Sequence, residues 1–433
     1  MKSDSRTARR ARRPGIAENP RIYWLTETFY PPQIGGVEFI ASHLSHGLVA
    51  TGLEVHVITR KPETSCLREE SIDGVHVRRI DPSGLSKGKG LRALPAMLSF
   101  LARLTFMLIH EARCYDVLIV SGMKIIPLAA VPIAALFGKR CIIRIESTAE
   151  LQEPVSRQSL RSMHGGLSRA LQNVSAWLQR KMLLHADRVV AISDVVHRRL
   201  LRMGLPEEKI SQIPNAIDLS QFHPVSRAER DRLRAELSLP HGATILLFAA
   251  RLSRAKGIEL LVKAWPRILV QHPELFLVIV GSGDGAFDAC ETEIAESIRR
   301  SGRAGERIRM IGVSQRVRHF LQAADLYISP SDYEGFGVGI VEALATARPC
   351  LVTPVGVVPQ LVRNGENGFV FPPRDLRGML LAIDHALAER DRWPEIGRRA
   401  RDAVSFLDVG TVVQQYAQLC EELVHPRQSG LQH

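Results

Sequence analysis

Cysteine is scarce in this chain of 433 residues, and no long apolar run is free of interruption. The six cysteines form no C-x-x-C pair and have no histidine at zinc-site spacing, which argues against a disulfide framework and a structural zinc. The longest apolar stretches, 93–109 and 125–137, are interrupted by Arg103 and by two prolines respectively, and both fall short of the roughly 18 clean residues of a spanning helix. No apolar segment follows the basic N-terminus as in a signal peptide. We therefore expect a cytoplasmic protein with reduced thiols.

Signatures of metal and dinucleotide binding are also missing or incomplete. No D-x-D triplet occurs, which weakens the expectation of an obligatory divalent metal on a diphosphate. The segment Gly281-Ser282-Gly283 lacks the third glycine of a dinucleotide fingerprint, because Ala286 stands at that place. A nicotinamide dehydrogenase is therefore disfavoured.

The chain does carry a basic excess, and nearly all of it lies in the first half. Residues 1–225 contain 31 Lys and Arg against 20 Asp and Glu, whereas residues 226–433 contain 26 against 25. Part of the excess is an arginine-rich tail within residues 1–20, which we expect to be disordered. A basic nucleic-acid-binding protein is one alternative, although aromatic residues do not alternate with the basic ones. Basic helices within 157–202 could instead lie on an anionic membrane or simply pack on a sheet with a solvated face.

Strand and helix patterns alternate along both halves of the chain. In the first half the predicted strands are 21–26, 54–59, 75–80, 117–120, 141–145 and 188–192, and the predicted helices are 37–50, 91–110, a basic helical region over 157–185, and 194–203. In the second half they are 245–249, 276–280, 308–311, 326–328, 349–353 and 368–371. This alternation predicts an α/β protein with two Rossmann-like domains, 21–216 and 217–405, facing a central cleft. Residues 406–433 are expected to hold a helix that returns to the first domain, followed by a tail.

The segment Glu334–Glu342 places two carboxylates eight residues apart with three glycines between them. It follows a short apolar strand and precedes a helix, so the glycines predict a turn whose backbone N–H groups can bind an anion such as phosphate. Carboxylates beside a phosphate repel it unless cations intervene. Arg251 and Lys256 follow another predicted strand, and in an open α/β sheet both segments would meet at the same edge.

These and other segments occur in an order typical of a known family. They are Pro31–Glu38, Ala186–Ser193, Ile213–Asp218, Arg251 with Lys256-Gly257, Val280–Gly283 and Glu334–Glu342. In these segments the chain resembles the family-four retaining glycosyltransferases, also called glycosyl transferases group 1, which have the GT-B fold. The resemblance covers about residues 21 to 424.

The resemblance implies that the second domain binds a nucleotide-sugar donor, linked to UDP or GDP, with no other cofactor and no metal. It implies three catalytic residues, Arg251, Lys256 and Glu334. The donor-binding residues would be Gly35, Gly36, Val313, Gly337, Val338, Gly339 and Glu342. On the acceptor side it suggests Glu38, His43 and Glu146, although a solvated glutamate and a packed histidine explain the first two better.

Four positions depart from the family pattern, because Ala216, Ala250, Ala347 and Val357 stand where glycine is usual. None of these departures removes a charged site residue, so we expect an active enzyme. The expected function is retaining, metal-independent transfer of a hexose to a glycan or lipid-linked acceptor in bacterial surface polysaccharide biosynthesis. The acceptor and the basic charge suggest peripheral contact with an anionic membrane at its inner face. A nucleotide-sugar 2-epimerase of the same fold is the alternative.

Overall fold

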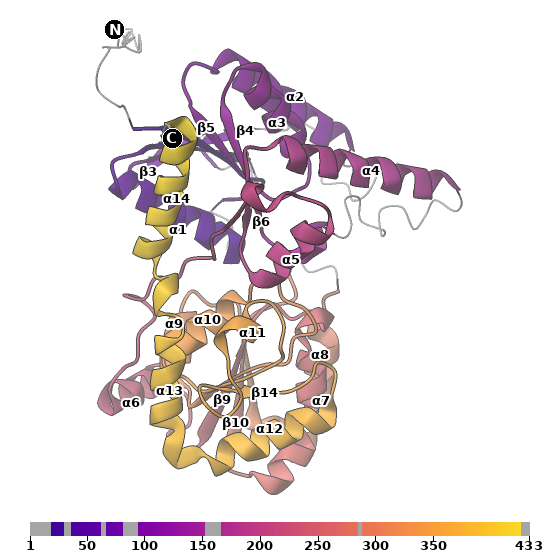
Figure 1. Cartoon of the computed structure of the whole chain (residues 1–433). Helices are drawn as coiled ribbons and strands as arrows, with labels where there is room; N and C mark the ends of the chain where they lie inside the picture. The colour runs from indigo at the N-terminus through magenta and orange to yellow at the C-terminus, as the bar shows by residue number, and fades with distance from the viewer. Residues whose placement is uncertain are drawn as a thin grey trace, which may run out of the picture.

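The computed structural model describes residues 19–29, 36–61, 66–80, 94–151, 166–284 and 288–425. Two sheets, each covered by helices, lie one above the other, and the chain passes between them twice (Figure 1). This confirms the predicted α/β fold with two Rossmann-like domains. The expected basic tail lies outside the described residues as far as residue 18.

The first sheet has eight strands in the order β3-β4-β2-β1-β5-β6-β7-β8. All its pairs are parallel except β3 with β4. The central strand β5 is buried at every residue, as expected for a parallel sheet covered on both faces. The strands are β1 (Arg21–Leu25), β2 (Glu54–Arg60), β3 (Glu69–Ile72), β4 (Val75–Ile80), β5 (Val117–Ser121), β6 (Arg140–Ile145), β7 (Arg188–Ala191) and β8 (Ile210–Gln212).

Helices cover both faces of the first sheet, and alternate residues of β1 pack against the helices on each face. Ile22 and Trp24 pack with α1 (Gly36–Ala50) and α14 (Val409–Val424). Tyr23 and Leu25 belong to the core on the other face, formed with α2 (Leu94–His110), α3 (Pro127–Leu136), α4 (Gly166–His185) and α5 (Asp194–Arg202). The predicted return of the C-terminal helix is therefore confirmed (Figure 1).

The second sheet has six parallel strands in the order β11-β10-β9-β12-β13-β14. They are β9 (Thr244–Ala249), β10 (Leu275–Val280), β11 (Ile308–Gly312), β12 (Leu326–Ser329), β13 (Cys350–Val352) and β14 (Phe369–Val370). The surrounding helices are α6 (Arg227–Glu236), α7 (Ile258–Gln271), α8 (Glu291–Arg300), α9 (Val317–Ala323), α10 (Val338–Ala345), α11 (Val358–Leu361), α12 (Leu376–Ala388) and α13 (Trp393–Asp402).

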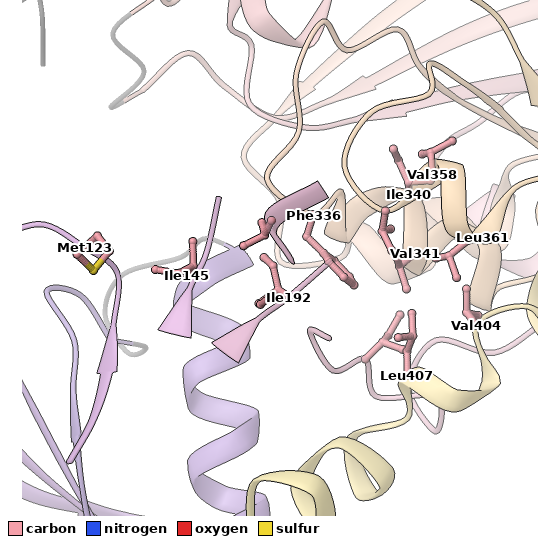
Figure 2. Packing of buried hydrophobic residues seen from close by; sticks show 14 of the residues in the cluster. Met123, Ile145, Ile192, Phe336, Ile340, Val341, Val358, Leu361, Val404 and Leu407 are labelled. Carbon is pink, nitrogen blue, oxygen red and sulfur yellow. The ribbon is translucent and has the colours of Figure 1, made fainter. Parts of the chain in front are cut away.

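The two passages of the chain between the sheets are hydrogen-bonded to each other. Ile217 N donates to Leu407 O at 2.9 Å, and Val409 N donates to Ile217 O at 2.9 Å. An apolar cluster continues across this link and includes Ile192 of the first domain and Phe336 of the second (Figure 2). The carboxyl ends of the two sheets are thereby held toward each other.

The elements that the sequence did not predict include β3, β8 and α3. The strand β3 is a short edge strand without a fully buried residue, so it lacks an apolar pattern. The helix α3 begins with Pro127 and contains Pro132, and all of its remaining residues are apolar, so it has no polar face that would mark a helical period. Among the described helices, none combines the length and the hydropathy required to cross a bilayer.

Ala347, one of the departures from glycine, adopts a left-handed backbone with φ of 56°. This conformation costs an L-residue about 1–2 kcal/mol, and glycine loses about 0.4–1 kcal/mol more entropy on folding. We predict that Ala347→Gly raises the free energy of unfolding by up to about 1 kcal/mol in urea denaturation. Ala295→Gly in the middle of α8 is the control and should lower it by about 1 kcal/mol. A loss of stability in Ala347→Gly similar to that of the control would contradict the strain.

Candidate active site

The segment from Glu334 to Glu342 joins β12 to α10, as the sequence predicts. Gly337 caps the helix with φ of 98°, a conformation that suits glycine. Its carbonyl accepts from the amides of Ile340 and Val341 at 3.0 and 3.1 Å. The amides of Val338 and Gly339 lie in the first turn of α10, where backbone donors have no acceptor within the helix. This end of the helix is therefore suited to bind an anion.

Lys256 and Glu334 form an ion pair at this turn. Lys256 Nζ lies 2.7 Å from Glu334 Oε2, and the two side chains are only 18% and 11% exposed. Ser331 Oγ donates to the other carboxylate oxygen at 2.8 Å. Next to Lys256, Gly257 has φ of 68°, and a Cβ there would lie 1.9 Å from Pro330 O. The loop after β9 and the loop after β12 are thus in direct contact.

Arg251 lies two residues beyond the end of β9 and is exposed to solvent. Within the described part of the chain, its side chain makes no hydrogen bond or ion pair. Arg254 is also exposed but pairs with Glu259 at 2.8 Å and with Glu293 at 2.9 Å. Of these two arginines, Arg251 is therefore the one that is available to an anionic ligand.

Glu342 lies within α10 and is half-buried. Burial raises the pKa of its carboxyl from 4.5 to about 8, and no hydrogen bond or ion pair of this carboxyl involves another described residue. On the same helix, a Cβ at Gly339 would lie 3.0 Å from Tyr327 Oη and 3.2 Å from Ala249 O, so the helix lies close to the end of β9. Val313, which directly follows β11, is 63% exposed.

Only some of the site residues predicted in the first domain lie within the described part of the chain. Gly35 lies outside the described residues, as does the side chain of Glu38, whereas Gly36 begins α1. His43 is half-buried on α1, and burial lowers the pKa of its imidazole, partly opposed by the charge of Asp218. Of these residues, the structure therefore places only the His43 side chain, near the interdomain link.

Glu146 belongs to a buried polar group at the end of β6. Its Oε1 accepts from Arg144 Nη1 at 2.7 Å, and Arg144, 1% exposed, also donates to Asn215 Oδ1 in the interdomain link. The sequence analysis missed Glu150, four residues further on. Burial, and then the charge of Glu146, raise the pKa of its carboxyl to about 8. The spacing of Glu146 and Glu150 was visible in the sequence, but the short 3-10 helix that brings them together was not.

The Glu334–Glu342 turn also touches this first-domain loop. The Tyr333 hydroxyl shares a hydrogen bond of 3.1 Å with Thr148 Oγ1 and accepts from Ala149 N at 2.9 Å. A Cβ at Gly335 would lie 2.7 Å from Glu146 O. The two predicted halves of the site, donor side and acceptor side, are therefore in contact across the domains.

Two family models match the chain, and they match its two halves. A glycosyl transferase 4-like domain matches residues 35–216, and glycosyl transferases group 1 matches residues 229–403. The chain therefore belongs to the glycosyl transferases group 1 family and is a glycosyltransferase of the GT-B type.

Individual relatives are distant. Alpha-maltose-1-phosphate synthase of Mycolicibacterium smegmatis is 26% identical over 266 residues, which cover 59% of this chain and 66% of that protein. D-inositol 3-phosphate glycosyltransferase of Nocardioides sp. is 28% identical over 381 residues, 83% of this chain and 79% of that protein. The solved structure of Anabaena Alr3699/HepE with UDP-glucose matches with a TM-score of 0.73 and 20% identity, over 93% of this chain and 100% of that chain.

Gly335 lies so close to the first domain that an added methyl group should clash with it. We expect Gly335→Ala to oppose domain closure at a cost of about 1–3 kcal/mol, because the nearest atom is backbone and cannot rotate away. Small-angle scattering should show a larger radius of gyration. Gly242→Ala, which meets no atom within 4 Å, is the control. Equal scattering curves for both variants would show that the domains do not meet here in solution.

The Glu342 carboxyl predicts a pH effect on stability. Between about pH 4.5 and 8 this carboxyl stays protonated in the folded protein and ionises on unfolding. Its contribution to the free energy of unfolding is therefore complete below pH 4.5 and is lost as the pH rises to about 8. Glu342→Gln keeps the group neutral. The free energy of unfolding of Glu342→Gln minus that of the wild type should therefore increase by about 2–4 kcal/mol between pH 4.5 and 8.5.

Denaturation across this pH range measures the difference. Glu421→Gln replaces an exposed carboxylate on α14 and is the control. A Glu342→Gln difference that stays constant with pH would contradict the raised pKa.

Proposed function

We propose that this glycosyltransferase moves a hexose from a UDP- or GDP-linked donor to a glycan or lipid-linked acceptor with retention of configuration and without a metal ion. The observation that supports this most is the Lys256–Glu334 ion pair at the N-terminus of α10, with exposed Arg251 at the same edge of the sheet. Arg251 and a helix N-terminus together supply positive potential for a diphosphate, while Lys256 offsets the charge of the neighbouring Glu334.

In this proposal the diphosphate binds the amides of Val338 and Gly339 after the turn at Gly337, and Arg251 pairs with it. Glu342, which has no partner among the described residues, accepts hydrogen bonds from the ribose hydroxyls. Ionisation of its carboxyl is opposed by burial, so hydroxyl donors that stabilise the charged form should lower its pKa. Val313 lines the nucleotide, and Gly35 and Gly36 approach the donor from the first domain.

Glu334 orients the donor sugar while Lys256 balances its charge. The bond from the anomeric carbon to the phosphate oxygen breaks, and the acceptor oxygen bonds to the same face of that carbon. The acceptor proton passes to the departing phosphate oxygen, so no protein nucleophile is required. Arg251 and Lys256 stabilise the negative charge that develops on this oxygen, which is the role a metal ion has in other transferases.

The acceptor binds the first domain, with Glu38, His43 and Glu146 as the residues expected to recognise it. The basic excess of that domain supports an anionic or lipid-linked acceptor, as used in bacterial surface polysaccharide synthesis on the inner face of the membrane. The UDP-glucose bound to the Anabaena neighbour supports a uridine nucleotide as the first donor to test.

A ligand screen tests the donor site. We predict that UDP-, GDP- or ADP-sugars raise the melting temperature of the wild type, with one base preferred. Arg251→Ala should weaken the preferred donor at least tenfold in calorimetric titration, whereas Arg254→Ala, whose side chain is paired with two glutamates, should not. Binding should persist in EDTA. Unchanged binding in Arg251→Ala would refute this donor site.

A further inference from the structure

The helix α3 has an apolar exposed side. Its outward residues are Leu128, Pro132, Ala135 and Leu136, at helical spacing, and Leu136 is 75% exposed. A helix packed on a soluble core normally presents polar residues at such positions. The sequence of α3 is PLAAVPIAAL and contains no polar residue. Its outward side therefore offers no side-chain hydrogen bond to water.

The helix α2 continues this apolar surface. Phe100, Leu104 and Leu108 are buried, as expected for its inner face. On the opposite side Leu98 and Phe106 are 54% and 70% exposed, and both lie on one helical stripe with Ala102 and Ile109. The helix is therefore apolar on both sides, although only one of them faces the core.

The helix α4 adds an aromatic anchor and positive charge. Trp177 is 58% exposed, and Lys181 Nζ lies 5.8 Å from the centre of its ring. α2 packs on α3 and α3 packs on α4, so the three helices form one continuous surface, at the upper right of Figure 1. We call this surface the outer face and define it by Leu98, Phe106, Ile109, Leu136, Phe137 and Trp177.

The charge on the outer face has one sign. None of the three helices contains Asp or Glu, whereas Arg103, Arg180 and Lys181 are exposed on them. Surface helices of the second domain differ, since α8 alone contains three glutamates. The three helices thus combine exposed apolar side chains with cations and contain no carboxylate of their own.

We propose that the outer face binds an anionic lipid bilayer, with its apolar side chains at the acyl boundary and its cations on lipid phosphates. Trp177, with its apolar ring and N–H group, is suited to the interface. A second copy of this chain fits less well, because two such faces would bring like charges together. The inference deepens the membrane part of the proposed function and rests on it for the acceptor.

Vesicle flotation of the full chain tests the proposal. Wild type should float with vesicles of phosphatidylglycerol and phosphatidylcholine at low salt, and much less with phosphatidylcholine alone or at high salt. Phe106→Ser with Leu136→Ser should reduce the bound fraction at least tenfold. The control is Val270→Ser with Leu381→Ser, which removes residues 84% and 57% exposed on the second domain. The charge test compares Arg180→Glu with Lys181→Glu against the control Arg299→Glu with Arg300→Glu on α8.

Each outcome of the flotation experiment either supports or overturns binding of the outer face to the bilayer. Loss of flotation in the outer-face variants but not in the controls supports the proposal. Absence of flotation in the wild type overturns it, and so does equal flotation of all variants. A wild-type dimer in analytical ultracentrifugation that Phe106→Ser with Leu136→Ser dissociates, without any vesicle binding, would assign the face to a second copy. Nucleotide-sugar binding, measured in the same samples by calorimetry, separates failure of the docking face from failure of the donor site.

Discussion

The ion pair between Lys256 and Glu334 is the interaction on which the geometry of the site depends. A partly buried pair contributes little net stability, because desolvation offsets the attraction. Its effect is to fix the relative position of two loops, one after β9 and one after β12, at the edge where the first turn of α10 is open. It also neutralises one of the two carboxylates of the turn, and in the proposed donor site this removes a charge that would repel the phosphates.

The two parallel sheets explain why the groups meet at all. Their carboxyl ends face each other, since the chain passes between the domains at Ile217 and again at Leu407, and these passages are bonded together. α14 then packs on α1, so the second domain is anchored to the first by both its ends. Arg144 connects this link to Glu146, directly after β6, through its hydrogen bonds to Asn215 and Glu146. The interdomain link is therefore hydrogen-bonded to the end of β6.

The sequence predicted the parts that follow local rules. Buried strands with apolar runs, such as β5 and β10, and the glycine turn before α10 were predictable because composition alone marks them. The contact of Tyr333 with Thr148 was not predictable, since it joins residues far apart in the chain. Glu150 was missed because its environment depends on folding: only burial beside Glu146 distinguishes it from a surface glutamate. The roles of the donor and acceptor residues remain proposals that the geometry supports.

The most direct test of the account compares the affinities of UDP and uridine for the wild-type protein by calorimetric titration. If the helix N-terminus, Arg251 and the Lys256–Glu334 pair form a diphosphate site, UDP should bind at least about 100-fold more tightly than uridine, or about 2.7 kcal/mol. Added salt should narrow the difference, since part of it is electrostatic. Equal affinities for the two ligands would contradict the central claim, because the phosphates would then contribute nothing to binding.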